Sequence, residues 1–245
     1  MRKFSLALLV LTSATGVAGA DEPKPVKAEL SWRITLDEQG HVTQIDAAGK
    51  QPVDKVPQIR ARLEKEIRGW QFTSGKLDGR PATTETGLHA WITLEPQHDD
   101  TVIIHVDKAT TGASIAHIVP PRYPPYAVAD HITGLVVLRI GYDASGKVTS
   151  VEPEPGAPKA SNVLVQSAVR AAQSWTFQPE RVGGYTRNGF AITPLCYRLT
   201  NLTTLRTQGK CDWKRPDSAE SVAEGEALAL DPAARLLSDV AGRAL

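Results

Sequence analysis

Two segments of the chain alternate between apolar and mostly polar residues. Every second residue is apolar over residues 30–36, and the same alternation returns over residues 136–142. A period of two is typical of a β-strand with one buried face. Each segment runs into a short polar turn that contains a glycine, Gly40 or Gly146, and glycine readily adopts the positive φ that such turns require. The pattern predicts two β-hairpins, whose second strands begin at Val42 and Val148.

A helical pattern follows each hairpin. Apolar side chains recur every three or four residues over 56–70 and again over 164–175, with charged or polar residues on the other side. Each helical segment ends at a tryptophan, Trp70 or Trp175, and a phenylalanine follows two residues later. We expect both tryptophans to pack the helix against the sheet, and this is favoured over a role as exposed binding aromatics.

These blocks form a repeat. Residues 32–42 correspond to residues 138–148 at an offset of 106 residues, and Trp70 corresponds to Trp175 at an offset of 105. A longer strand completes each block, over residues 88–94 and 190–199, and residues 101–106 are expected to add one more strand to the first block. We therefore predict an α+β protein of two tandem β-β-α-β domains, each an antiparallel sheet with one helix packed across it.

The N-terminus has the features of a secretory signal peptide. Arg2 and Lys3 precede an apolar run over residues 4–11, and Ala18-Gly19-Ala20 has the small residues of a cleavage site. An uncleaved anchor is the weaker alternative, because a membrane-spanning helix needs ~20 apolar residues. The predicted division is 1–20 signal peptide, 21–107 first domain, 108–119 linker, 120–214 second domain, and 215–245 a C-terminal helical tail broken at Pro232.

Cys196 and Cys211 are the two cysteines of the chain. In a secreted protein an even number of cysteines predicts a disulfide, and closing a loop of this size contributes about 3 kcal/mol in the chain-entropy description. A metal site would need two further ligands, and none lies nearby in the sequence. The sequence therefore predicts a disulfide between Cys196 and Cys211, and neither a metal site nor another cofactor.

Charge and motif content disfavour several classes of function. Without residues 1–20 the chain has 26 basic and 27 acidic residues, whereas nucleic acid and anionic membranes attract concentrated basic surfaces. The histidines lack the HxH or HxxxH spacing of metal sites, and no GxSxG nucleophile motif or phosphate-binding glycine loop occurs. We expect no enzymatic activity, no nucleic-acid partner, and no stable membrane insertion after signal cleavage.

The second block carries further motifs in a fixed order. A Pro- and Tyr-rich segment at residues 121–127 precedes the first strand, and the turn, the helix, Trp175–Pro179, Gly183-Gly184 and the last strand follow. This order resembles the C-terminal domain of the TonB family, the periplasmic end of a bacterial energy transducer, over about residues 120–199. No single element is specific, but five elements in this order and spacing are. The first block lacks the entry segment and resembles a degenerate copy.

The resemblance implies a periplasmic module that binds other proteins. In the family, the last strand is an exposed edge with which outer-membrane transporters pair a short extended segment. Carried over to this chain, that edge is residues 190–199. Arg187, Arg198 and the disulfide would protect it from aggregation, and Pro194 removes one donor from it. The predicted partner-binding residues are Phe190, Ile192, Leu195, Tyr197 and Leu199.

The chain also departs from a transducer, which needs a membrane anchor and a long Pro-rich spacer. We therefore expect a secreted periplasmic protein-recognition module that binds an extended peptide, or an envelope or outer-membrane protein, by strand addition. The alternative is a rigid periplasmic scaffold, or a small-ligand-binding protein, formed by the packed repeats. An open final strand favours the first interpretation, and an edge covered by the other repeat or by the tail favours the second.

Overall fold

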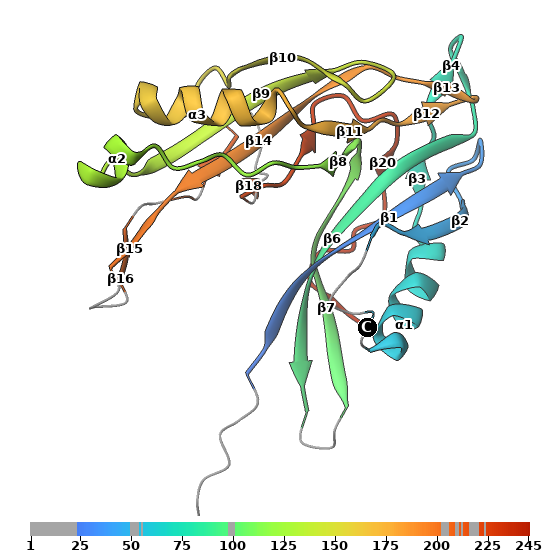
Figure 1. Cartoon of the computed structure of the whole chain (residues 1–245). Helices are drawn as coiled ribbons and strands as arrows, with labels where there is room; N and C mark the ends of the chain where they lie inside the picture. Colours follow the sequence, from blue (N-terminus) through green and yellow to red (C-terminus); the bar gives the residue numbers. More distant parts are fainter. Residues whose placement is uncertain are drawn as a thin grey trace, which may run out of the picture.

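The computed structural model describes residues 24–49, 54, 56–97, 101–201, 206–208, 211, 213–215, 221–222 and 224–245. It contains two units that lie against each other, each with a helix on an antiparallel sheet (Figure 1). The predicted α+β class is confirmed. The predicted signal peptide lies outside the described residues, among which no helix is long and apolar enough to cross a membrane.

The elements are as follows. Up to residue 117 they are β1 (Val26–Leu36), β2 (Val42–Ala47), α1 (Pro57–Arg68), β3 (Phe72–Thr73), β4 (Lys76–Leu77), β5 (Arg80–Pro81), β6 (Thr84–Pro96), β7 (Val102–Gly112) and β8 (Ser114–His117). Next come α2 (Pro125–Ala129), β9 (Gly134–Tyr142), β10 (Val148–Pro153), α3 (Asn162–Ala172), β11 (Thr176–Gln178), β12 (Arg181–Val182), β13 (Tyr185–Thr186) and β14 (Gly189–Tyr197). The remainder contains β15 (Leu199–Asn201), β16 (Arg206–Gln208), β17 (Trp213–Lys214), β18 (Ser221–Val222), β19 (Leu228–Ala229), β20 (Arg235–Leu236) and β21 (Arg243–Ala244).

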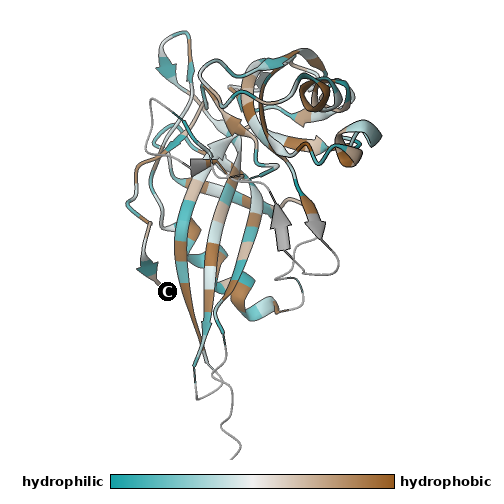
Figure 2. Cartoon of the chain, turned by 90° about the vertical axis from the view of Figure 1, so that its left-hand side faces the viewer, coloured by the Kyte–Doolittle hydropathy of each residue, from teal (hydrophilic) through white to brown (hydrophobic). Residues whose placement is uncertain are grey.

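In the first unit β1 pairs with β2 on one side and with β6 on the other, and β7 pairs with the far edge of β6. The alternation along β1 buries Leu30, Trp32 and Ile34, and α1 covers this face through Leu63 and Ile67. Figure 2 shows the alternation as bands of hydrophobic and hydrophilic residues along the long strands. The period of two thus places the core of this unit between the sheet and α1.

In the second unit β9 lies between β10 and β14. One face of this sheet packs against α3 through Leu164, Ala168 and Ala172. The opposite face forms a separate apolar cluster with Trp213 and other residues that follow β14 in the chain. Both faces of the second sheet are therefore covered, which explains why β14 contains a run of five buried residues from Ala191 to Leu195.

In each unit the turn that follows the first strand has the same structure. The carboxylate of Asp37 accepts the backbone N–H groups two and four residues later, at 3.0 and 2.8 Å, and Asp143 does the same at 2.8 and 3.0 Å. Gly40 and Gly146 adopt φ of 85° and 83°. Their carbonyls accept the N–H of Phe72 (3.1 Å) and of Phe177 (2.8 Å). In each unit the glycine carbonyl of the turn therefore fixes the hairpin to the strand that follows the helix in the chain.

The two tryptophans occupy the buried positions expected of them. Trp70 is 6% exposed and Trp175 is 1% exposed, and each belongs to the apolar core of its own unit. The indole N–H of Trp175 also donates to the Val119 carbonyl at 2.8 Å. The prediction that both residues pack helix against sheet is confirmed.

The predicted linker at residues 108–119 is wrong for most of its length. The strand expected over residues 101–106 continues to Gly112 as β7, and Ser114–His117 forms β8, which pairs with β11 of the second unit. The small and polar residues of this segment resemble a linker, but several of them are β-branched and fit a strand. Gly112 allows close approach, because a side chain there would meet Ala229.

The predicted helical tail is also wrong. Residues 224–245 contain no helix and form β19, β20 and β21, which pair with β14, β3 and β7 in turn. Alanine and leucine favour helices as isolated segments, but Gly225 and Pro232 leave too short an interval for a stable helix. Pairing with existing strands and burial of Ala234 and Val240 in the first core determine the extended conformation.

Candidate functional site

The residues predicted to bind a partner lie in three different environments. Phe190 is 50% exposed, whereas Ile192 is buried on the face of the sheet that Trp213 covers. Leu195 and Tyr197 belong to the core beneath α3. Leu199 lies beyond β14, in β15. The structure therefore brings four of the five onto one strand, of which Phe190 alone is an exposed side chain.

The outer edge of β14 is not open. Its inner edge pairs with β9 from Gly189 to Tyr197. On the outer edge Ala191 pairs with Ala229, and Ile192 pairs with Leu228. The N–H groups of Leu230 and Gly225 also donate to the carbonyls of Phe190 and Pro194, both at 2.9 Å. The expectation of an exposed final edge is thus wrong for residues 190–194, because the chain's own C-terminal segment returns to cover it.

Residues 224–231 cover this edge and are called the covering segment below. Ion pairs hold the covering segment near both of its ends. Arg198 donates to Glu224 at 2.7 Å, and Arg187 donates to Asp231 at 3.1 Å. Both arginines were predicted to protect the edge, and both contact the segment that covers it. Since all four side chains are at least 37% exposed, each pair contributes about 0.2–1 kcal/mol.

A third ion pair, between Lys108 and Glu226, is more deeply buried. The Lys108 ammonium lies 3.1 Å from the Glu226 carboxylate, whose side chain is 2% exposed. The same ammonium lies 4.5 Å from the centre of the Trp91 ring on the first sheet. Removing either partner of a buried pair costs more than removing an exposed one, because a desolvated charge remains. Glu226 therefore joins the covering segment to the first unit.

The centre of the covering segment is apolar. Leu228 packs in the cluster that contains Leu135, Val137, Ile192 and Trp213. Ala229 lies so close to Gly112 that a side chain on Gly112 would meet it. A pocket of about 280 Å³ opens beside the segment, lined by Tyr142, Thr149, Arg187, Asn188, Gly189, Phe190, Leu230 and Asp231. We call the surface that residues 224–231 occupy the channel: it is apolar around Leu228, and Arg198 and Arg187 lie near its two ends.

The disulfide lies at the end of this channel. Cys196 of β14 is bonded to Cys211, with their Cα atoms 5.6 Å apart, as predicted. The guanidinium of Arg198 lies 3.2 Å from the sulfur of Cys196 and 2.9 Å from that of Cys211. The bond closes the loop that follows β14 and so lowers the entropic cost of bringing the covering segment back to β14.

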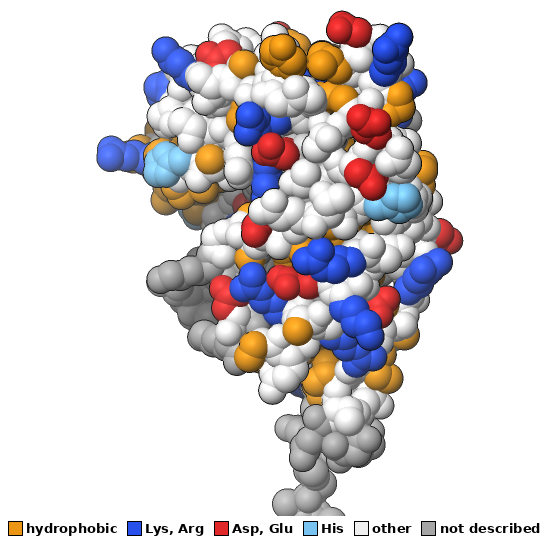
Figure 3. Space-filling model, turned by 90° about the vertical axis from the view of Figure 1, so that its right-hand side faces the viewer, with side chains coloured by type: hydrophobic (Ala, Val, Ile, Leu, Met, Phe, Trp, Pro, Cys, Tyr) orange, Lys and Arg blue, Asp and Glu red, His pale blue; other side chains and the backbone are white. Residues whose placement is uncertain are grey.

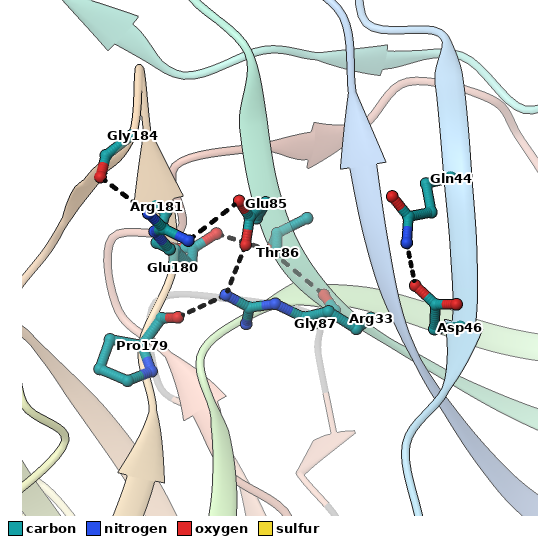
Figure 4. Close-up of polar contacts among 10 residues, drawn as sticks. All are labelled: Arg33, Gln44, Asp46, Glu85, Thr86, Gly87, Pro179, Glu180, Arg181 and Gly184. Carbon is teal, nitrogen blue, oxygen red and sulfur yellow. Dashed lines mark hydrogen bonds and ion pairs between the residues drawn. The ribbon is translucent and has the colours of Figure 1, made fainter.

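The two units meet at a polar interface around the start of β6. β12 of the second unit pairs with β6, as Arg181↔Glu85 and Val182↔Thr84. Figure 4 shows Arg33 donating to the Pro179 carbonyl, at 2.7 Å, and facing Glu85 at 3.9 Å. Burial lowers the pKa of Arg33, and Glu85 opposes that effect. Backbone pairing and charge together fix how the units sit against each other.

Glu180 lies at the centre of this interface and is 3% exposed. Its carboxylate accepts the Thr86 hydroxyl at 2.6 Å and the Ala233 N–H at 2.8 Å. Burial raises the pKa of this carboxyl, while these hydrogen bonds oppose the increase. Glu180 thus connects the first unit, the second unit and the C-terminal segment through one side chain.

The described residues contain no metal cluster, and the face shown in Figure 3 has no concentrated basic surface. No group of three or more His, Cys, Asp or Glu side chains that could hold a metal occurs among the described residues. On the face shown in Figure 3, Lys and Arg side chains lie interspersed with Asp and Glu. This view shows no concentrated basic field of the kind that binds nucleic acid.

Sequence reasoning missed the covering segment as part of the site. Ala227, Leu228, Ala229 and Leu230 alternate small and large residues, which is also a strand pattern, and acidic residues flank them at Glu226 and Asp231. Helix propensity hid this signal, because alanine and leucine rank among the strongest helix formers. The partners of these acids are far away in the sequence, so nothing local indicated them.

Comparison with known proteins supports the resemblance of the second unit. A family described as Gram-negative bacterial TonB protein C-terminal matches residues 119–199. Protein TonB of Xanthomonas campestris pv. campestris (strain B100) is 32% identical over 91 residues, or 37% of this chain and 40% of that protein. Protein tonB2 of Pseudomonas aeruginosa is 28% identical over 90 residues, or 37% of this chain and 33% of that protein.

These matches have a limited extent. The chain spans 40% or less of the length of these relatives, and the family match leaves out the first unit. No solved structure gives a significant match to the chain. The resemblance to the TonB C-terminal family is thus confirmed for the second unit, and the similarity of the first unit to that family rests on the internal repeat.

Proposed function

We propose that this protein is a periplasmic recognition module that binds an extended segment of an envelope or outer-membrane protein along β14. The observation that carries the proposal is the outer edge of β14, which the chain's own segment covers with only two residue pairs. A partner's strand would replace β19 and donate the same backbone hydrogen bonds to the carbonyls of β14. Strand addition suits this geometry because main-chain bonds supply affinity and alternate side chains supply specificity.

In this proposal the predicted residues have different roles, which their burial supports. Phe190 would contact the partner directly, because it is half exposed and its carbonyl already accepts the Leu230 N–H. Ile192 would offer its backbone, since its side chain is buried. Leu195 and Tyr197 would position the strand from the core, and Leu199 would lie beyond the paired region. Pro194 lacks an N–H, so pairing beyond it would be interrupted.

The location and the origin of the units belong to the same proposal. The N-terminal sequence supports secretion through a cleavable signal peptide, and the second unit matches a family described as Gram-negative. Both units have the same Asp turn and the same hydrogen bond from the glycine carbonyl of that turn. These shared features support descent of both units from one duplicated β-β-α-β domain. In this proposal the second unit recognises the partner, and the first unit holds the C-terminal segment.

Locking the edge tests the function. The double variant Phe190→Cys/Leu230→Cys would join β14 to the covering segment, since these residues already share a backbone hydrogen bond. The unlocked chain should enrich a defined envelope protein from membrane extracts, and the locked chain should not. The control Phe190→Ser/Leu230→Ser makes similar truncations without the bond. Equal enrichment by locked and control chains would refute strand exchange at β14.

A second candidate function is a rigid periplasmic scaffold. The pairing of β12 with β6 and the buried Glu180 favour it, because they join the two units firmly. A pocket of about 490 Å³ on the first sheet, lined by Lys27, Ala28, Glu29, Trp91, Ile92, Asp107, Lys108 and Glu226, would be available to a small ligand. A scaffold that never opens would capture its partners equally well in the locked form.

A further inference from the structure

From the segment that now covers β14, we propose the chemistry of the partner segment: acids flanking an apolar centre that alternates small and large residues. The inference rests on the proposed function, because it concerns the same edge. Residues 224–231 read Glu-Gly-Glu-Ala-Leu-Ala-Leu-Asp. They fill the channel with matched charge and shape, so they show what the channel accepts.

Charge sets the first requirement. Each of the three acids in the segment meets a base on the channel: Glu224 meets Arg198, Glu226 meets Lys108, and Asp231 meets Arg187. The Glu226 position should discriminate most, since its side chain is 2% exposed while the other two acids are at least 42% exposed. A basic residue at that position would put like charges together in a desolvated place.

Shape sets the second requirement. A large aliphatic side chain is needed at the Leu228 position, where Leu135, Val137, Ile192 and Trp213 surround it. A small residue is needed at the next position, since Ala229 lies against Gly112. The pairing of Ala229 with Ala191 also fixes the direction, so the partner segment runs antiparallel to β14.

A synthetic peptide tests this directly. Leu228→Asp puts a carboxylate into the apolar cluster and should release residues 224–231, while residues 233–245 keep their own contacts with the first unit. A labelled peptide of sequence EGEALALD should bind this variant saturably. It should show at least tenfold weaker binding to the wild-type chain, because the tethered segment competes at a millimolar effective concentration.

Matched peptides separate the two requirements. KGKALALK reverses the three charges, and EGEALLLD enlarges the position that faces Gly112. Each should bind the released variant at least tenfold more weakly than EGEALALD. Binding of KGKALALK as tight as that of EGEALALD would overturn the charge requirement, and equal binding of EGEALLLD would overturn the size requirement.

A second variant guards against loss of folding. Glu224→Gln/Asp231→Asn removes two surface ion pairs and leaves the core unchanged. If circular dichroism shows that Leu228→Asp is unfolded, this variant should bind EGEALALD about fivefold more tightly than the wild-type chain does, because the covering segment opens more easily. Equal binding by these two chains would then overturn the inference. Absence of EGEALALD binding to a folded, released chain would overturn the inference. Capture of an envelope protein by the unlocked chain is measured separately, so failure of the peptide test does not decide whether the edge binds partners.

Discussion

The strands that complete the two repeats, β6 and β14, occupy equivalent places, yet their outer edges are covered very differently. β6 pairs with β7 over ten residue pairs, from Gly87↔Gly112 to Pro96↔Val102, and a short loop joins the two strands. β14 pairs with β19 over two residue pairs. In the sequence these two strands are separated by the segment that contains Cys211, which is bonded to Cys196 of β14. The first edge is covered by its neighbour in sequence, and the second by a distant segment.

This difference indicates which edge can be exchanged. A hairpin neighbour closes a short loop at low entropic cost, and ten pairs of residues would have to separate before a competitor could enter. The covering segment is held by two residue pairs, two further backbone hydrogen bonds, the buried Leu228 and three ion pairs, and we expect it to open at a lower free energy than the hairpin. We infer that the β6 edge is sealed for stability, whereas the β14 edge is protected from aggregation but open to replacement.

The largest effect is expected from the two tryptophans, where the units are alike. Trp70→Ala and Trp175→Ala each remove a large buried side chain from one core and should lower the free energy of unfolding by about 3–5 kcal/mol. Chemical denaturation followed by circular dichroism measures both. A cost below 1 kcal/mol for either would contradict equivalent roles for the two residues.

A somewhat smaller loss of stability is expected from substitution of the turn glycines, which are equivalent in the two units. Gly40→Ala and Gly146→Ala would strain a positive φ and press a methyl group against the carbonyl of Phe72 or Phe177. Each should cost about 3 kcal/mol in unfolding free energy. Gly79→Ala and Gly184→Ala are matched controls, because φ is positive but the space is open, and they should cost about 1 kcal/mol.

The sequence predicted the elements whose information is local. The period of two in β1 and β9, the Asp and Gly turns, and the helical stripes that end at Trp70 and Trp175 were sufficient to predict the sheets and helices. The covering of β14 depends on pairs far apart in sequence, such as Arg198 with Glu224 and Gly112 with Ala229. No local pattern contains such pairs, so tertiary contacts overrode the helix propensity of the tail.

An effect of intermediate size is expected on the pH dependence of stability, because β6 has a histidine where β14 has none. His89 on β6 is mostly buried, with 14% of its side chain exposed. Its Nδ1 lies 3.0 Å from the Ser31 hydroxyl and 3.9 Å from the Glu29 carboxylate, and its equivalent on β14 is Pro194. Burial, and secondarily Lys108, lowers the pKa of His89 to about 4. Because the unfolded imidazole binds protons near pH 6.5, its contribution to stability is complete above that pH and is lost as pH falls toward 4.

The expected loss from this histidine at pH 4.5 is about 2 kcal/mol. His89→Gln should remove that part of the acid sensitivity, so the difference between the two chains isolates the residue from other acidic and basic groups. Denaturation curves at pH 7.5 and pH 4.5 give the comparison. An identical loss of stability in both chains would show that His89 is not buried in its neutral form.

The smallest expected effect is on how readily the covering segment separates from the edge of β14. The backbone N–H groups of Gly225 and Leu230 donate to β14, and their hydrogen exchange reports opening of the covering segment. Glu224→Gln/Asp231→Asn should lower their protection by about 1 kcal/mol, since each surface pair contributes 0.2–1 kcal/mol. Raising ionic strength from 0.15 M to 1 M should reduce protection in the wild-type chain, because the screening length falls from ~8 Å to ~3 Å.

The sealed edge supplies the control for this last prediction. Glu95→Gln removes a surface carboxylate that lies 3.0 Å from the His105 imidazole in the β6–β7 hairpin. It should leave the exchange of the β7 amides unchanged, because ten backbone pairs hold that strand. The salt effect at Gly225 and Leu230 should shrink in the double variant, in which one of the three ion pairs remains. If these two amides are as protected as those of β7 in every chain, the covering segment is as permanent as the hairpin, and the scaffold is the better description of this protein.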